Sequence, residues 1–253
     1  MSDGLRGPLI VKDPGSPYAG KYSDELVVTV SDWYHKEAPD LIPVYLSPAN
    51  NPSGAEPVPY SSLINEAQNV KLAVKPNTTY LIRIISIGAF SQSYVHFDQH
   101  DLTIIAIDGI YVQPRKVSTL YVANAQRYDV LLTTKNSTGT NYAFFSNLDT
   151  TKFDNVPGYL HPNATGYLVY DASKHIPAEA PRVGSYDITD DITLVPQDGQ
   201  LLLSGPPDAS IVLNLDFFQR DGQNRYAQSP HCHFDSMQTD TTSLEQDSII
   251  SPS

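Results

Sequence analysis

Short apolar stretches recur along this chain of 253 residues, and each is bounded by turn-forming residues. Within a stretch, apolar and polar side chains alternate, which is typical of a half-buried β-strand. The expected strands cover residues 25–33, 78–87, 102–107, 117–123, 127–133, 141–145, 166–170 and 210–217. Helical periodicity is confined to a short piece at residues 62–67. The pattern predicts an all-β chain, folded as an antiparallel sandwich or barrel.

The charge of the chain argues against two classes of partner. It carries 28 acidic and 16 basic residues, which gives a formal net charge of -12. Such a chain repels phosphate backbones and anionic lipids, so nucleic acid is not an expected partner. No apolar run approaches the roughly 18–20 residues that cross a bilayer, so no membrane span is expected.

Asn-X-Ser/Thr sequences at Asn77, Asn136 and Asn163 are candidate N-glycosylation sites in polar, turn-like stretches. They favour a secreted protein. Met1 is nevertheless followed directly by polar residues, without the basic and apolar regions of a signal peptide. We therefore expect the signal peptide and the start of the protein to be missing. Cys232 is the single cysteine, which excludes a disulfide within the chain.

Three segments of the chain carry a family resemblance. They are DGLRGPLIV at residues 3–11, VSDWYH at residues 30–35 and the stretch 97–131, which begins FDQHDLT and includes QRYDVL. They resemble the strand that closes the first cupredoxin domain, the strand that opens the second, and the second-domain signature of multicopper oxidases of the laccase and ferroxidase type. The resemblance implies a cupredoxin-like Greek-key β-sandwich or barrel, in agreement with the strand pattern.

The same resemblance gives a domain organisation. Residues 1–22 are expected to be a remnant of the first cupredoxin domain, and residues 23–171 the second, plastocyanin-like domain. Residues 172–227, rich in proline and aspartate, are expected to form a linker and the first strand of a third domain. Residues 228–253 are polar and lack alternation, which predicts a disordered tail.

The resemblance implies copper as the cofactor of the full-length enzyme, held by cysteine and by His-X-His pairs. Alternate residues of a strand share a face, so such a pair can reach one metal centre. The chain has one such sequence, formed by His231, Cys232 and His233, and it resembles the family's C-terminal copper motif. Ser236 and Met237 stand where that motif has tryptophan and a last histidine. We name these three residues as candidate copper ligands, but expect this chain to bind no stoichiometric copper.

Three other histidines are expected to be structural. His96 and His100 are four residues apart, a spacing that suits zinc on a helix but not on the strand and turn expected here. His35 lies in a WYH sequence that continues with Lys36 and not with the copper-ligand pattern.

Two loops resemble iron-binding segments of fungal iron-uptake ferroxidases. The first, NPSGAEPVP at residues 51–59, contains Glu56, which the resemblance makes a ligand of ferrous iron. The second, DTTKFDNVP at residues 149–157, supplies an aspartate, placed at Asp154, with Asp149 as a further candidate. The third carboxylate of the family's site belongs to the absent domain.

The resemblance therefore implies a fragment of a ferroxidase that oxidises Fe(II) to Fe(III) at the cell surface, reduces O2 to water and passes iron to a permease. The isolated chain is expected to be inactive, because the electron acceptor is absent. Two alternatives stay open. One is a fragment of a laccase-like phenol oxidase, against which the loop at residues 51–59 argues. The other is a secreted, non-enzymatic β-sandwich that binds iron or a partner.

Overall fold

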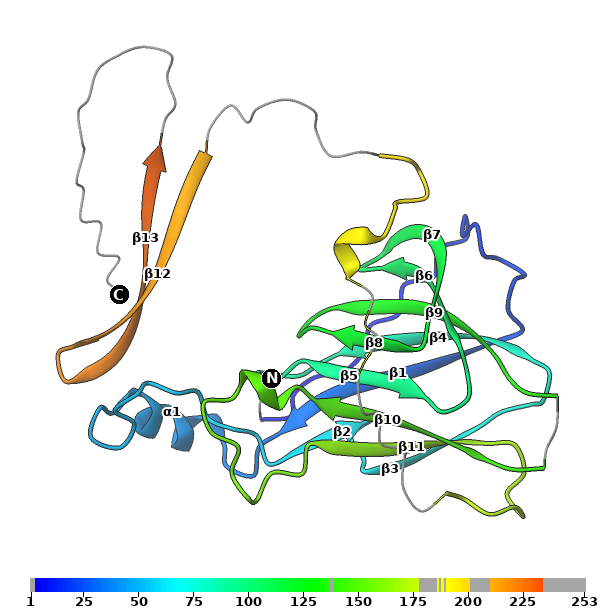
Figure 1. Ribbon diagram of the computed structural model, residues 1–253, viewed down its shortest axis with the longest axis horizontal. Helices are drawn as coiled ribbons and strands as arrows, with labels where there is room; N and C mark the ends of the chain where they lie inside the picture. Colours follow the sequence, from blue (N-terminus) through cyan, green and yellow to red (C-terminus); the bar gives the residue numbers. More distant parts are fainter. Residues whose placement is uncertain are drawn as a thin grey trace, which may run out of the picture.

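The computed structural model describes residues 3–136, 139–177, 186, 188, 190–200 and 210–233, the last range without the side chains of 210–218 and 226–233. Two sheets face each other and a separate hairpin follows (Figure 1). The six-stranded sheet has the order β2-β1-β4-β9-β6-β7, and the five-stranded sheet has the order β3-β11-β10-β5-β8. The all-β, cupredoxin-like sandwich expected from the sequence is confirmed.

The strands of the sandwich are β1 (Asp24–Trp33), β2 (Ser61–Ile64), β3 (Asn69–Ala73), β4 (Thr79–Ser86), β5 (Ser93–Phe97), β6 (Leu102–Ile107), β7 (Ile110–Val117), β8 (Thr119–Val122), β9 (Arg127–Thr133), β10 (Tyr142–Leu148) and β11 (Asn163–Val169). The sheets are mixed and not purely antiparallel, because β1 pairs with β4 in parallel and β11 pairs with β3 in parallel. A parallel pair needs a crossover. Here the chain between β1 and β4 provides it by visiting both sheets.

The core lies between the two sheets and is built from the inward-facing residues of the alternating strands. Phe97 and Phe144 are fully buried and stack with their ring centroids 4.5 Å apart. Gly166 on β11 faces this stack, and a Cβ at that position would collide with the Phe144 ring. The glycine is therefore required by packing between neighbouring strands.

The helix lies elsewhere than expected. Residues 62–67 form the end of β2 and a turn, in which Asn65 and Glu66 adopt left-handed φ values of 46° and 58° that no α-helix contains. The observed helix is α1 (Ala38–Leu46), which begins with a proline in its first turn and contains Pro43. A proline is tolerated in the first turn because the amide hydrogen there needs no helical partner. None of the described helices is long and apolar enough to cross a membrane.

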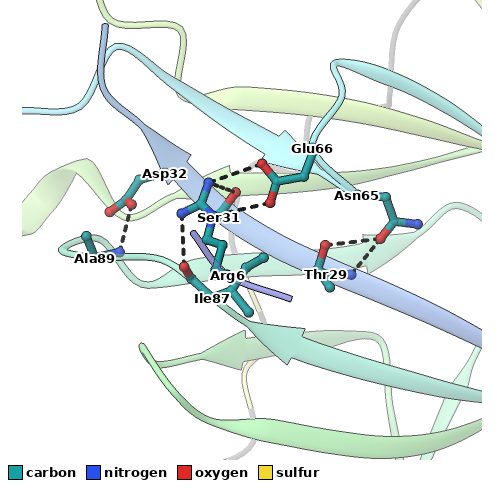
Figure 2. A network of polar contacts seen from close by, with 8 residues as sticks. All are labelled: Arg6, Thr29, Ser31, Asp32, Asn65, Glu66, Ile87 and Ala89. Atoms are coloured by element: carbon teal, nitrogen blue, oxygen red, sulfur yellow. Dashed lines mark hydrogen bonds and ion pairs between the residues drawn. The ribbon is translucent and has the colours of Figure 1, made fainter. Parts of the chain in front are cut away.

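The N-terminal segment packs against the sandwich through Arg6, whose side chain is only 2% exposed. Its guanidinium donates to the Ile87 carbonyl at 3.0 Å and to the Ser31 hydroxyl at 3.2 Å, and it pairs with Glu66 at 3.2 Å (Figure 2). Further along, the Tyr18 hydroxyl donates to the Val112 carbonyl at 2.8 Å. Residues 3–22 are thus joined to the sandwich at several points, which also include a hydrogen bond from the Tyr111 hydroxyl to the Asp13 carboxylate at 2.9 Å.

The hairpin consists of β12 (Ser210–Arg220) and β13 (Gln223–His233), paired antiparallel (Figure 1). Asp221 and Gly222 form its tight turn with φ values of 54° and 70°, as two-residue hairpin turns require. The strand expected at residues 210–217 is present and longer. Disorder was expected from residue 228, but residues 228–233 belong to β13, which continues to His233 by backbone pairing that needs no apolar alternation. Residues 234–253 lie outside the described part.

Candidate iron site

Glu56 lies in a loop, residues 51–59, whose backbone is fixed by side-chain hydrogen bonds. The Asn51 amide donates to the carbonyls of Tyr45 and Ala55 at 3.0 and 2.9 Å. The Tyr34 hydroxyl donates to the Pro57 carbonyl at 3.0 Å. Glu56 itself is exposed. The loop therefore presents a solvent-accessible carboxylate on a constrained backbone.

Asp154 lies in the loop that follows β10, which opens with a one-turn 3-10 helix, η1 (Thr150–Lys152). Phe153 is 9% exposed and fixes the inner side of this loop, whereas Asp154 directly after it is exposed. The alternation of a buried ring and an exposed carboxylate gives the loop one side that packs and one side that faces solvent.

These two loops meet in a small hydrophobic cluster. It contains Phe153 with Leu148 and Leu160, and Val58 and Phe90 pack against it. The rings of Phe90 and Phe153 are stacked at 5.4 Å. Val58 is two residues after Glu56, so the cluster joins the loop of Glu56 to the loop of Asp154. We call the edge of the sandwich formed by residues 51–59 and 149–157 the rim.

Asp149 has a different environment from the other two acids, because it is 3% exposed and its carboxylate is already engaged. It accepts hydrogen bonds from the Tyr121 hydroxyl at 2.7 Å and from the hydroxyl and amide of Thr151 at 2.6 and 3.1 Å. Burial alone would raise the pKa of Asp149, but the hydrogen bonds from Thr151 and Tyr121, with nearby Lys152, outweigh it and hold the pKa below its ordinary value. Asp149 thus caps η1 and fixes the start of the Asp154 loop.

Tyr34 lies beside Glu56 in a shallow hollow of about 250 Å³, which Phe90 and Leu41 also line. Burial raises the pKa of the Tyr34 hydroxyl, and the charges of Asp32, Tyr159 and Glu56 add to the effect. The phenol therefore stays protonated and keeps donating to the loop.

Three of the described imidazoles make hydrogen bonds or ring contacts. His96 bonds a backbone carbonyl at 2.8 Å, His100 bonds the Tyr170 hydroxyl at 2.8 Å, and His35 stacks on Tyr60 with centroids 3.8 Å apart. These contacts agree with the structural roles expected for the three residues. Among the side chains that the structure describes, no group of three His, Cys, Asp or Glu could hold a metal ion.

The donor groups in the described part do not fit a copper centre, because no three His, Cys, Asp or Glu side chains there could share a metal ion. His231, Cys232 and His233 form the end of β13, where their backbones pair with residues 210–212. Their side chains lie outside the described part of the structure, so their copper role stays a prediction.

The candidate glycosylation sites differ in their surroundings. Asn77 is an exposed turn residue with φ 49°, and Asn136 is exposed in the loop after β9. Asn163 is exposed too, but it is the first residue of strand β11, paired with Asn147, and not part of a loop. The sequence expectation of three turns is therefore wrong for Asn163.

Two residues that support the rim were absent from the sequence-based site. Asp32 and Phe90 share no motif with the carboxylates and come from other parts of the chain. The VSDWYH segment contains Asp32, but its contacts depend on which strands become neighbours.

Comparison with known proteins agrees with the fold. A family model described as multicopper oxidase matches residues 24–173. The iron transport multicopper oxidase of Gibberella zeae is 46% identical over 225 residues, which cover 88% of this chain and 35% of that protein. The corresponding protein of Epichloe festucae is 45% identical, over 84% of this chain and 34% of that one. The chain thus spans about a third of the length of these relatives.

Solved structures show the same relationship. The crystal structure of Fet3p, described as a multicopper oxidase that functions in iron import, superposes with a TM-score of 0.81 and 35% identity, over 86% of this chain and 41% of that one. A laccase from Botrytis aclada superposes with a TM-score of 0.67 and 24% identity, over 82% of this chain and 40% of that one, a likeness of fold alone. The chain therefore belongs to the multicopper oxidase family.

Proposed function

We propose that this chain is part of a ferroxidase and supplies two carboxylates, Glu56 and Asp154, to its Fe(II) site. The observation that carries the proposal is the hydrophobic cluster of the rim, which joins the two loops while both carboxylates stay exposed. A third carboxylate comes from the remainder of the full-length protein. Asp149, with its hydrogen bonds satisfied internally, supports the Asp154 loop and is not a ligand in this proposal.

The chemistry of the two carboxylates suits iron oxidation. They are hard oxygen donors, and their negative charge stabilises Fe(III) more than Fe(II), which makes loss of the electron easier. Each Fe(II) gives up one electron, and four electrons with four protons reduce one O2 to two waters. Copper of the full-length enzyme supplies the redox centres, and the described residues of this chain bind and orient the iron.

Three further properties belong to the proposal. The oxidised iron passes to an iron permease, the protein works at the cell surface, and it carries N-linked glycans. Exposure of Asn77, Asn136 and Asn163 supports the last point. The iron-transport names of the relatives from Gibberella zeae and Epichloe festucae support the first, and they favour a ferroxidase over a phenol oxidase.

The test uses a full-length multicopper oxidase that contains this domain. Glu56→Gln and Asp154→Asn should each raise KM for Fe(II) or slow its oxidation, while oxidation of a phenol is retained. Asp101→Asn is the matched control, because Asp101 is an exposed acid beside His100, away from the rim. Equal effects on both substrates, or on neither, would show that the two carboxylates are not an iron site. Iron binding without O2 uptake would favour the non-enzymatic alternative.

A further inference from the structure

The end of strand β1 holds both loops of the rim. We infer that Asp32 and Tyr34 are positioning residues that set the spacing of Glu56 and Asp154 in the iron site. This inference rests on the proposed function, since it concerns the same carboxylates.

Asp32 holds residues 89–91, the segment that contains Phe90. Its carboxylate is 1% exposed and accepts hydrogen bonds from the backbone amides of Ala89, Phe90 and Ser91 at 2.8, 2.7 and 2.8 Å. Figure 2 shows the Asp32 carboxylate beside Ala89. Asp32 itself lies on the strand that also carries Ser31. Within the described residues no cation pairs with Asp32. Three converging amide dipoles therefore stabilise the buried charge, and they fix residues 89–91 tightly in return.

The segment held by Asp32 contains Phe90, and Phe90 contacts the loop of Asp154. The Phe90 ring stacks on Phe153, and Phe153 is adjacent to Asp154. A shift of the Phe90 backbone would move the ring that supports the inner side of this loop. Asp32 therefore acts on Asp154 through two stacked rings.

Tyr34, two residues after Asp32, acts on the other loop. Its hydroxyl donates to the carbonyl of Pro57, the residue that follows Glu56. Asp32, near the end of β1, and Tyr34, directly after the strand, thus act on the two carboxylate loops separately. Stability of the fold alone does not require one strand end to hold two different loops. A metal site with one ligand in each loop does require it, because the distance between the two ligands must be fixed.

The experiment titrates Fe(II), under anaerobic conditions, into the copper-free form of a full-length multicopper oxidase that contains this domain, so that the third carboxylate of the proposed site is present. Tyr34→Phe removes one hydroxyl and should weaken Fe(II) binding roughly tenfold, the lower end of what loss of a supporting hydrogen bond costs a metal site. Tyr18→Phe is the matched control, since it removes the same tyrosine-to-carbonyl bond away from the rim and should leave the affinity within about twofold.

Asp32→Asn replaces one acceptor oxygen of the carboxylate by an NH2 group. This group is a donor and would face backbone amides that are donors as well. The substitution should weaken Fe(II) binding more than Tyr34→Phe does and speed hydrogen exchange at residues 89–91. Asn65→Ala is its control, because the Asn65 side chain accepts from the Thr29 amide of the same strand at 2.7 Å without touching that segment (Figure 2). Both variants should lower Tm, but only Asp32→Asn should change the affinity.

The outcomes separate the two proposals. If Glu56→Gln and Asp154→Asn leave Fe(II) binding unchanged, or the full-length protein binds no Fe(II), the iron site and this inference both fail. If those variants weaken binding but Tyr34→Phe and Asp32→Asn match their controls, the iron site stands and the positioning role is overturned. Unchanged hydrogen exchange at residues 89–91 in Asp32→Asn would also overturn the role of Asp32.

Discussion

Two exposed carboxylates of the rim contrast with two buried polar side chains at the opposite end of the sandwich. At the rim, Glu56 and Asp154 are exposed. At the opposite end, which we call the far end, His100 and Asn141 are 4% and 1% exposed and hydrogen-bonded. The Asn141 side chain accepts from the amides of residues 170 and 171 and donates to the carbonyls of residues 171, 174 and 175. Satisfied groups stabilise the fold, whereas exposed carboxylates are free to bind a ligand.

The core variant Phe144→Ala should have the largest effect, and it should not distinguish the two ends. Phe144 is fully buried in the stack with Phe97, so truncation should cost about 3–5 kcal/mol of unfolding free energy. Chemical denaturation followed by two probes, one at each end, should show one common transition. Separate transitions would mean that the rim and the far end unfold independently.

Asn141→Ala should destabilise the chain by about 1–3 kcal/mol, because it leaves buried amides and carbonyls without partners. Fe(II) binding by the folded variant should be unchanged, since the site lies at the other end. The free energy comes from urea titration and the affinity from anaerobic calorimetry. If Asn141→Ala lowered the Fe(II) affinity more than Glu56→Gln does, the proposal that Fe(II) binding depends on the rim and not on the far end would be contradicted.

Between about pH 5 and 8, the far end should also show a pH dependence that comes from His100. Burial lowers the pKa of His100, Lys135 adds to this, and the carbonyl and charge of Asp98 with the charge of Asp101 oppose it. The unfolded chain therefore takes up this proton near pH 6.5 and the folded chain only at lower pH, so the stabilisation is complete above about pH 6.5 and lost as the pH falls.

The slope from this one group is at most about 1.4 kcal/mol per pH unit between the two pKa values. Comparing unfolding free energies of the wild type and His100→Gln from pH 5 to 8 should reveal it, with the variant showing the flatter curve. Identical curves would mean that His100 titrates alike in the folded and unfolded chain.

The smallest effect on stability is expected at the rim itself. Glu56→Gln should change the unfolding free energy by no more than about 0.5 kcal/mol, because the side chain is exposed. Thermal unfolding in metal-free buffer is the measurement. A loss above about 1 kcal/mol would assign Glu56 a structural role and contradict its classification with the exposed acids.

Alternation of apolar and polar residues predicted most strands of the sandwich. It failed at an edge strand and next to tight turns, where other factors determine the secondary structure. Strand β7 contains Pro114, which breaks the expected pattern, but β7 is an edge strand and needs no amide hydrogen on its outer side. Strand β13 is held by backbone pairing after a tight turn and carries no apolar alternation. The helix expected at residues 62–67 was wrong because Asn65 adopts a left-handed conformation that the sequence pattern does not reveal.

The candidate site was predictable in part. Resemblance of two loops pointed to Glu56 and Asp154, and the structure shows that a hydrophobic cluster joins these loops. The same reasoning preferred Asp154 to Asp149 but could not give the physical difference between them, which includes the hydrogen bond from Tyr121, a residue of another strand. Asp32 belongs to the VSDWYH segment that the sequence analysis singled out. Its role could not be predicted there, because it depends on the position of residues 89–91 beside β1.

The buried Arg6 guanidinium has a mechanical consequence. It bonds Ser31 on β1 and the carbonyl of Ile87, just after β4, and these strands are neighbours in the interior of the six-stranded sheet. Tension applied to the chain before Arg6 is therefore divided among these two central strands and, through the ion pair with Glu66, the turn that follows the edge strand β2. A pull on this segment is spread over three strands and is not concentrated on the hydrogen bonds of one edge strand.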